Sequence, residues 1–122
     1  ADLVDGDPAT VYADIAARCR TAFERADLDQ EMDTPMGVRT VADRLAFPAI
    51  DLYVHAWDLA TAAGMSVEIP DTVVEFAHAF IDPLPEERVW GPQGAFAAKV
   101  EPPGDATLTE QFVAWTGRRP RP

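Results

Sequence analysis

Apolar residues recur at intervals of three and four along four stretches of this chain, the spacing typical of amphipathic helices. The pattern predicts helices over about residues 8–25, 40–64, 71–82 and 107–116. The stretch from Thr40 to Gly64 is the longest and is apolar nearly all round, which is typical of a helix with neighbours on most sides. We therefore predict an all-α fold, in a single domain spanning residues 1–122.

Residues that favour helix ends stand at the boundaries of these stretches. Thr40 precedes Asp43 by three residues, and Thr107 precedes Glu110 by the same interval, which is the spacing of a capping box. Pro48 lies inside the long helix and is expected to kink it. The predicted caps are Asp7, Thr40, Asp71 and Thr107 at the N-termini, with Gly64 and Gly117 at the C-termini.

The only cysteine lies on the apolar stripe of the first helix. Val11, Ile15, Cys19 and Phe23 follow one another at four-residue steps, so we expect Cys19 on a buried face. A small core residue is the favoured interpretation of Cys19, and a reactive thiol is the alternative. A single cysteine excludes an internal disulfide and a cysteine-based zinc finger.

Two long connections separate the helices. Residues 26–39 are polar and acidic, and we interpret them as a solvated loop interrupted by proline and glycine. Residues 86–106 are expected to form an ordered surface loop that wraps the helices, pinned by Trp90, Phe96 and Val100. The basic C-terminal run at residues 118–122 is expected to be a mobile tail.

The long helix carries the residues with the clearest chemical potential. Asp51 lies four residues before His55 and Asp58 three after it, so the three side chains share one stripe of a helix that we expect to be buried. Buried ionisable groups must be paired, hydrogen-bonded or bound to a metal. Asp51 and His55 are thus candidate metal ligands, or members of a hydrogen-bonded pair in the core. The other histidine, His78, is expected to be partly exposed and not a ligand.

Charge and hydropathy exclude several classes of partner. The net charge is −11 and the isoelectric point is about 4.3, which opposes binding to nucleic acid or to an anionic membrane surface. No apolar run is long enough to span a bilayer, and the N-terminus lacks the pattern of a signal peptide. We therefore expect a cytoplasmic protein.

Two runs resemble actinobacterial metal-binding proteins of the DinB-like superfamily, which includes mycothiol-dependent maleylpyruvate isomerase and related thiol S-transferases. They are DLYVHAWDLATAAG at residues 51–64 and VWGPQGAFAAKVEPPGDATLTEQFVAWTGRRP at residues 89–120. The family pattern is a carboxylate or histidine, three residues, a histidine, then Trp-Asp-Leu-Ala, with a final phrase near Gly-Arg-x-Pro. The matching positions here are Asp51, His55, Trp57 to Ala60 and Gly117 to Pro120.

The resemblance implies a four-helix bundle, or its C-terminal part, with a divalent metal ion, zinc or nickel, between the helices. It makes Asp51 and His55 two of the metal ligands. The family's remaining histidine comes from a helix upstream of the present sequence, so about two helices are expected to be missing. Asp58 is expected to orient the ligands, by its place on the stripe.

Two functions from different classes remain open at this point. In the first, the metal activates a small thiol such as mycothiol for transfer or isomerisation. In the second, the chain is a non-catalytic module that binds a partner, and Asp51, His55 and Asp58 form a hydrogen-bonded group without metal. Because the long helix needs neighbours on most of its circumference, we also expect a homodimer, or pairing with an upstream fragment of the same protein.

Overall fold

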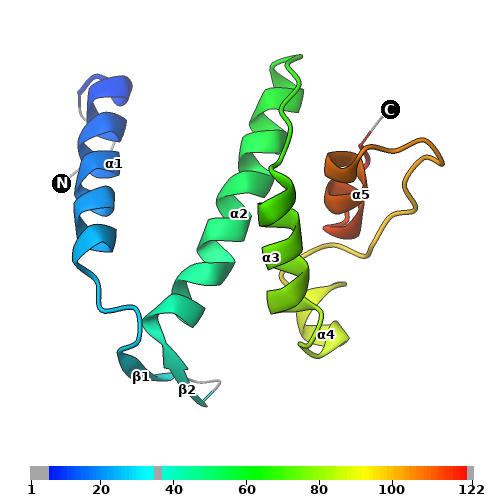
Figure 1. The fold of residues 1–122 in the computed structure, drawn as a ribbon. Coiled ribbons are helices and arrows are strands. Elements are labelled where there is room, and N and C mark those ends of the chain that lie inside the picture. The colour runs from blue at the N-terminus through cyan, green and yellow to red at the C-terminus, as the bar shows by residue number, and fades with distance from the viewer. Residues whose placement is uncertain (1–5, 35–36, 121–122) are drawn as a thin grey trace. The chain divides into compact units, whose positions relative to one another are not determined.

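The computed structural model describes residues 6–34 and 37–120. The chain divides into two compact units, Ala1–Arg44 and Leu45–Pro122. Most of the described chain is helical, and one short two-stranded sheet is present (Figure 1). The helical class is therefore confirmed in its broad form, whereas the sheet departs from the prediction of an all-α fold.

In the first unit, α1 spans Pro8–Arg25. Asp7 is its N-cap, as predicted, and its carboxylate accepts the Thr10 backbone N–H at 3.0 Å. No residue of α1 is buried, and Cys19 is exposed, so the prediction of a buried cysteine is wrong. The apolar stripe identified the face that a neighbour could cover, but burial also requires an element that packs on that face.

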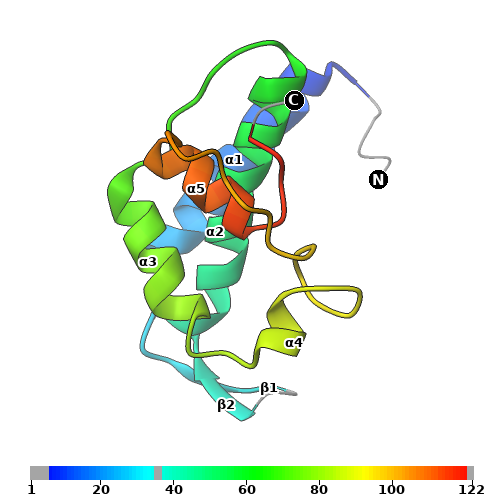
Figure 2. The same ribbon diagram turned by 90° about the vertical axis from the view of Figure 1, so that its right-hand side faces the viewer.

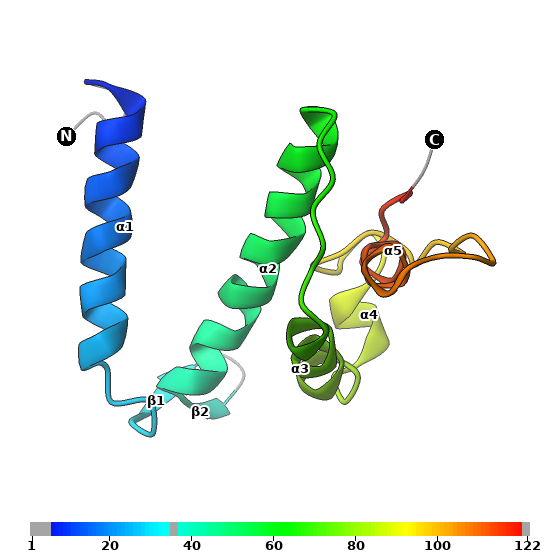
Figure 3. The ribbon, with the colours of Figure 1, turned by 45° about the horizontal axis from the view of Figure 1, so that its top comes forward.

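The acidic connection is a β-hairpin rather than the loop that we predicted. β1 (Glu31–Thr34) pairs antiparallel with β2 (Gly37–Thr40), and Thr34 lies opposite Gly37. Gly37 has a φ of 90°, a conformation that glycine adopts without a steric penalty, and its carbonyl accepts the Thr34 hydroxyl at 2.7 Å. Gly37, which we took as a marker of a loop, is thus the first residue of β2. β2 leads directly into the next helix (Figure 3).

The long helix, α2, spans Val41–Ala62 and continues without a break through Pro48. Its start matches the predicted capping box, because the Asp43 N–H donates to the Thr40 hydroxyl at 3.1 Å and the Thr40 N–H donates to the Asp43 carboxylate at 3.2 Å. Its end is also as predicted. Gly64 has a φ of 68°, and the next N–H, that of Met65, donates to the Ala60 carbonyl at 2.8 Å.

The second unit contains the hydrophobic core. α3 (Asp71–Ile81), the one-turn α4 (Glu86–Val89) and α5 (Leu108–Trp115) follow the long helix, and α5 lies beside α3 (Figure 2). Buried side chains from these elements and from the connections meet in one cluster. Its members are Ile50, Val54, Ile69, Val74, Ala77, Ile81, Val89, Phe96, Phe112 and Val113.

Of the two N-caps predicted in this unit, the one at α5 is confirmed and the one at α3 is wrong. The capping box of α5 is present, since the Glu110 N–H donates to the Thr107 hydroxyl at 3.2 Å and the Thr107 N–H to the Glu110 carboxylate at 2.8 Å. At α3, however, Pro70 occupies the N-cap position and makes no side-chain cap bond. Asp71 is the first helical residue, where its charge still favours the positive end of the helix dipole.

The wrapping segment between α3 and α5 is ordered, as predicted, although α4 was not foreseen. Phe96 is buried, and the Trp90 indole N–H donates to the Trp115 carbonyl at 2.8 Å. The Val100 N–H donates to the Ala114 carbonyl at 2.9 Å. The three residues expected to pin this segment therefore make contacts that hold it.

None of the helices in residues 6–34 and 37–120 is long and apolar enough to cross a membrane.

Candidate functional site

Asp51, His55 and Asp58 lie on one stripe of α2, as their spacing predicts, but that stripe is not buried. Their side chains are 51%, 56% and 35% exposed, respectively. The buried face of α2 is instead formed around Ile50 and Val54. The prediction of a buried ionisable stripe is therefore wrong, because an apolar composition all round a helix does not mean that neighbours cover it all round.

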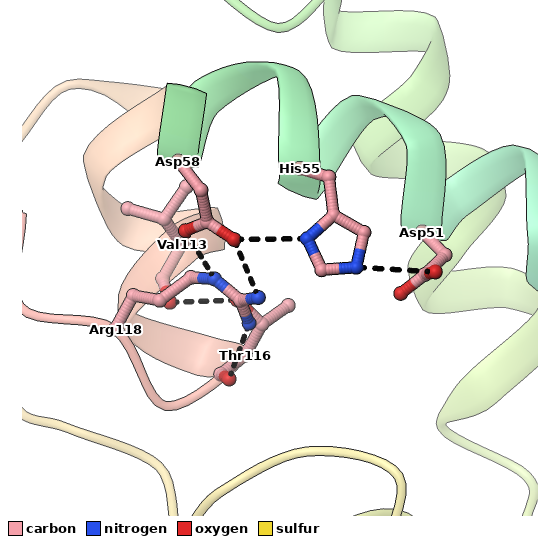
Figure 4. A network of polar contacts seen from close by, with 6 residues as sticks. All are labelled: Asp51, His55, Asp58, Val113, Thr116 and Arg118. Carbon is pink, nitrogen blue, oxygen red and sulfur yellow. Dashed lines mark hydrogen bonds and ion pairs between the residues drawn. The ribbon is translucent and has the colours of Figure 1, made fainter. Parts of the chain in front are cut away.

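The two carboxylates hold His55 from opposite sides of its ring (Figure 4). Nε2 lies 3.3 Å from the Asp51 Oδ2 atom, and Nδ1 lies 3.1 Å from the Asp58 Oδ2 atom. A single ion bound at one ring nitrogen therefore has one of these carboxylates beside it and the other across the ring. This arrangement gives Asp51 and Asp58 different roles toward the imidazole.

Arg118, which sequence reasoning assigned to a mobile tail, is the fourth member of this group. Its Nε donates to Asp58 Oδ1 at 2.8 Å, and its Nη2 donates to Asp58 Oδ2 at 2.9 Å. Two parallel bonds of this kind are the strong, directional form of an ion pair. The expectation of a mobile tail is wrong for Arg118, while residues 121–122 lie outside the described residues.

Local structure at the end of α5 positions Arg118. The Gly117 N–H donates to the Ala114 carbonyl at 2.9 Å and the Arg118 N–H to the Val113 carbonyl at 3.0 Å, with Gly117 at a φ of 84°. This is the glycine-dependent helix end. A Cβ at Gly117 would lie only 2.7 Å from the Ala97 Cβ, so the close approach also requires glycine.

A further bond orients the Arg118 guanidinium, whose Nη1 donates to the Thr116 carbonyl at 3.2 Å (Figure 4). Thr116 is itself fully buried. The Thr116 hydroxyl donates to the Val113 carbonyl at 2.8 Å. The side chain that reaches α2 therefore starts from a backbone segment fixed in the core of the second unit.

The Arg118 guanidinium holds the pKa of Asp58 below its ordinary value. Partial burial acts in the opposite direction, and the hydrogen bond from His55 adds a smaller lowering. Asp58 is therefore a carboxylate at neutral pH and accepts a hydrogen bond from His55 Nδ1. A neutral His55 that donates this bond carries its proton on Nδ1 and presents its Nε2 lone pair toward Asp51, whereas a protonated His55 donates to both carboxylates.

The contact between Nε2 and Asp51 is attractive when Nε2 carries a proton or a metal ion. A neutral imidazole with its proton on Nδ1 presents a lone pair at Nε2, and the Asp51 carboxylate also presents lone pairs, so the two repel each other at 3.3 Å. A proton on Nε2 or a metal ion relieves this repulsion. Two donors on one zinc-like ion, each about 2.0–2.2 Å from it, lie about 3.0–3.5 Å apart. The separation of Nε2 and Oδ2 fits that range.

His78 offers a second Asp–His pair with a different setting. Its Nδ1 lies 3.1 Å from the Asp82 Oδ2 atom, and its ring centroid lies 4.4 Å from that of Trp115. The ring is partly exposed, as predicted. Within the described ranges, no cluster of three or more histidine, cysteine, aspartate or glutamate side chains is arranged to hold one metal ion. Asp51 and His55 are therefore two candidate ligands that have no third candidate beside them in the described residues.

No family model, no curated protein and no solved structure matches this chain. The function is therefore inferred from the residues that the structure brings together. Of the predicted site residues, Asp51, His55 and Asp58 lie in one connected group, and Arg118 joins that group from α5.

Proposed function

We propose that Asp51 and His55 are two protein ligands of a divalent metal ion, zinc or nickel, in a DinB-like four-helix bundle or the C-terminal part of one. The observation that supports this most strongly is the 3.3 Å separation of His55 Nε2 and Asp51 Oδ2 on an exposed stripe of α2. Two lone-pair donors at that distance are suited to share one cation.

Asp58 and Arg118 support this proposal from the other side of the ring. A histidine that binds a metal through Nε2 commonly donates its Nδ1–H to a carboxylate, which fixes the ring and makes Nε2 more basic. Asp58 is placed for that role, 3.1 Å from Nδ1, and Arg118 holds both of its oxygens. Two of the four residues would thus contact the metal, and two would orient the histidine.

Half-exposed ligands leave room for a substrate at the proposed site. Catalytic metal sites keep an open position next to their protein ligands. When bound, the metal would supply Lewis-acid chemistry, in which a coordinated thiol loses its proton near neutral pH. The resemblance in sequence suggests a small thiol such as mycothiol as the cosubstrate, in S-transfer or isomerisation. Asp51 and His55 would hold the reacting centre, and Asp58 would keep the imidazole in its productive tautomer.

A non-catalytic partner-binding module is the alternative function. It is supported by large apolar side chains that α2 exposes beside the site, among them Leu52 and Leu59. In that case Asp51, His55, Asp58 and Arg118 form only an ion-pair network. Metal binding separates the two functions, because an ion-pair network alone does not retain a metal.

The test is metal binding measured by calorimetry and by metal analysis of the purified protein. We expect zinc or nickel to bind, and His55→Ala and Asp51→Ala each to weaken binding by more than about 100-fold, beyond the ~10–100-fold effect of losing an orienting partner. His78→Ala is the matched control, since His78 is also paired with a carboxylate four residues away on a helix end, and it should keep full affinity. Equal affinity in the His55→Ala and His78→Ala variants would refute the proposal.

A further inference from the structure

Thr116, the C-cap residue of α5, is fully buried, and its hydroxyl lies beside the guanidinium of Arg118. The hydroxyl donates to the Val113 carbonyl at 2.8 Å, which commits its proton and leaves its oxygen as an acceptor. Arg118 Nη1 lies 3.4 Å from that oxygen and 3.2 Å from the Thr116 carbonyl oxygen (Figure 4). Thr116 therefore offers two acceptors to one nitrogen of the guanidinium.

The bond to Val113 gives little reason for a hydroxyl at this buried position. A threonine that bonds a carbonyl one turn back in its own helix gains no helix stability from that bond, and burying a hydroxyl costs free energy that a valine would avoid. Within the described ranges, Arg118 is the other residue that the Thr116 hydroxyl contacts. The acceptor capacity of the hydroxyl is thus used by Arg118.

A guanidinium is planar and rigid, so holding one edge of it orients the other edge. With Nη1 held by Thr116, Nε and Nη2 of Arg118 donate to the two oxygens of Asp58 at 2.8 and 2.9 Å. Asp58 Oδ2, which accepts Nη2, also lies 3.1 Å from His55 Nδ1. The direction of this oxygen toward the imidazole therefore depends on how firmly Arg118 is held.

We propose that Thr116 is a positioning residue for His55, which acts through Arg118 and Asp58 to keep the imidazole proton on Nδ1 and Nε2 turned toward Asp51. Three successive contacts connect the buried hydroxyl to the half-exposed ring, and all of these residues belong to the second unit. Without the Thr116 oxygen, Nη1 loses an acceptor, the Arg118 side chain gains freedom, and neutral His55 exchanges more readily between its tautomers. The inference rests on the proposed function only where it concerns metal affinity.

The tautomer of His55 tests this role directly. ¹⁵N NMR of the metal-free chain at pH 8, where histidine side chains are largely neutral, should show the wild-type proton on Nδ1. In Thr116→Val the population of the Nε2–H tautomer should rise by at least ~3-fold, as expected for the loss of one weak hydrogen bond. Thr116→Ala removes the same oxygen and serves if the valine variant does not fold. Thr116→Ser keeps the hydroxyl and should restore the wild-type spectrum.

Thr109→Val is the matched control for a purely structural effect. Thr109 is also buried, and its hydroxyl bonds the Ile69 N–H at 2.9 Å and the Glu68 carboxylate at 2.8 Å. This variant should lose stability and still show the wild-type spectrum of His55. An unchanged tautomer in the variants that lack the Thr116 hydroxyl, or an equal shift in Thr109→Val, would overturn the inference.

Zinc calorimetry separates this inference from the proposed function. Thr116→Val should weaken zinc binding by about 3–10-fold, less than the ~10–100-fold effect of losing a direct orienting partner of the histidine. A tautomer that shifts as expected in a chain that binds no zinc overturns the proposed function and leaves the role of Thr116. Zinc bound equally well by wild type and Thr116→Val overturns the inference and leaves Asp51 and His55 as ligands.

Discussion

Replacing Arg118 by glutamine removes the guanidinium that clamps Asp58 and keeps part of the side chain. The pair is bidentate, and the two side chains are 23% and 35% exposed. Exposed ion pairs contribute about 0.2–1 kcal/mol, and breaking a fully buried pair costs about 3–5 kcal/mol. An intermediate burial, discounted for solvent screening, gives a loss of about 2 kcal/mol in the free energy of unfolding. In urea, this corresponds to a fall of about 1 M in the midpoint.

The pH dependence of that loss identifies its cause. Because the pKa of Asp58 is lowered in the folded state, its contribution to stability is fully present above the unfolded value of about 3.9 and is lost as the pH falls through the lower folded pKa. The difference between wild type and Arg118→Gln should therefore be constant from pH 7 to about 5 and shrink below pH 4. Arg119→Gln, at the exposed neighbouring arginine, should change stability by less than about 0.5 kcal/mol.

A double-mutant cycle with Asp58→Asn completes the test. The second substitution should cost little once Arg118 is already glutamine, because the two side chains act as one unit. Additive losses, or a difference that does not change between pH 7 and pH 3, would show that the reasoning about the clamp is wrong.

Two further predictions concern the fold that positions the site. Gly117→Ala should destabilise the protein by about 2 kcal/mol or more, because the added Cβ would overlap Ala97 and the φ of Gly117 is positive. Gly104→Ala is the control and should be tolerated, since no atom lies within 4 Å of the added carbon. Equal thermal melts of the two variants would contradict this prediction. Thr109→Val should lower the free energy of unfolding by about 1–3 kcal/mol, because the Ile69 N–H loses the hydroxyl that accepts it at 2.9 Å. Thr109→Ser keeps a hydroxyl and should recover most of that loss, as measured by urea unfolding. A serine variant as unstable as the valine variant would refute the role of that bond.

Features set by neighbouring residues could be predicted from the sequence. The capping boxes at Thr40 and Thr107 and the glycine at the end of α2 involve residues within a few positions of one another, so their geometry follows from the sequence alone. The relative placement of Asp51, His55 and Asp58 followed in the same way from 3.6 residues per turn. These local rules held because they do not depend on what packs against the helix.

Features set by the rest of the molecule could not be predicted in this way. The hairpin depends on pairing between Glu31–Thr34 and Gly37–Thr40, and the polar composition of that segment concealed it. Burial was overestimated for Cys19 and for the Asp51 stripe, because periodicity defines a face but not its neighbour. Arg118 contacts Asp58 across 60 positions of sequence, and no local pattern assigns one partner to an arginine at that separation.

The two sides of the His55 ring differ in a way that a purely structural network would not require. On the Nδ1 side, Asp58 is anionic and both of its oxygens are held by Arg118, so this side is fixed and uses its bonding capacity within the protein. On the Nε2 side, Asp51 is half exposed and no second group of the described residues holds its carboxylate against the ring as Arg118 holds Asp58. A network that served stability alone would gain little from this half-exposed contact, because exposed ion pairs contribute little to the free energy of unfolding. The proposed metal site would use this difference, because Asp58 and Arg118 would fix the imidazole from one side while Nε2 stays accessible on the other.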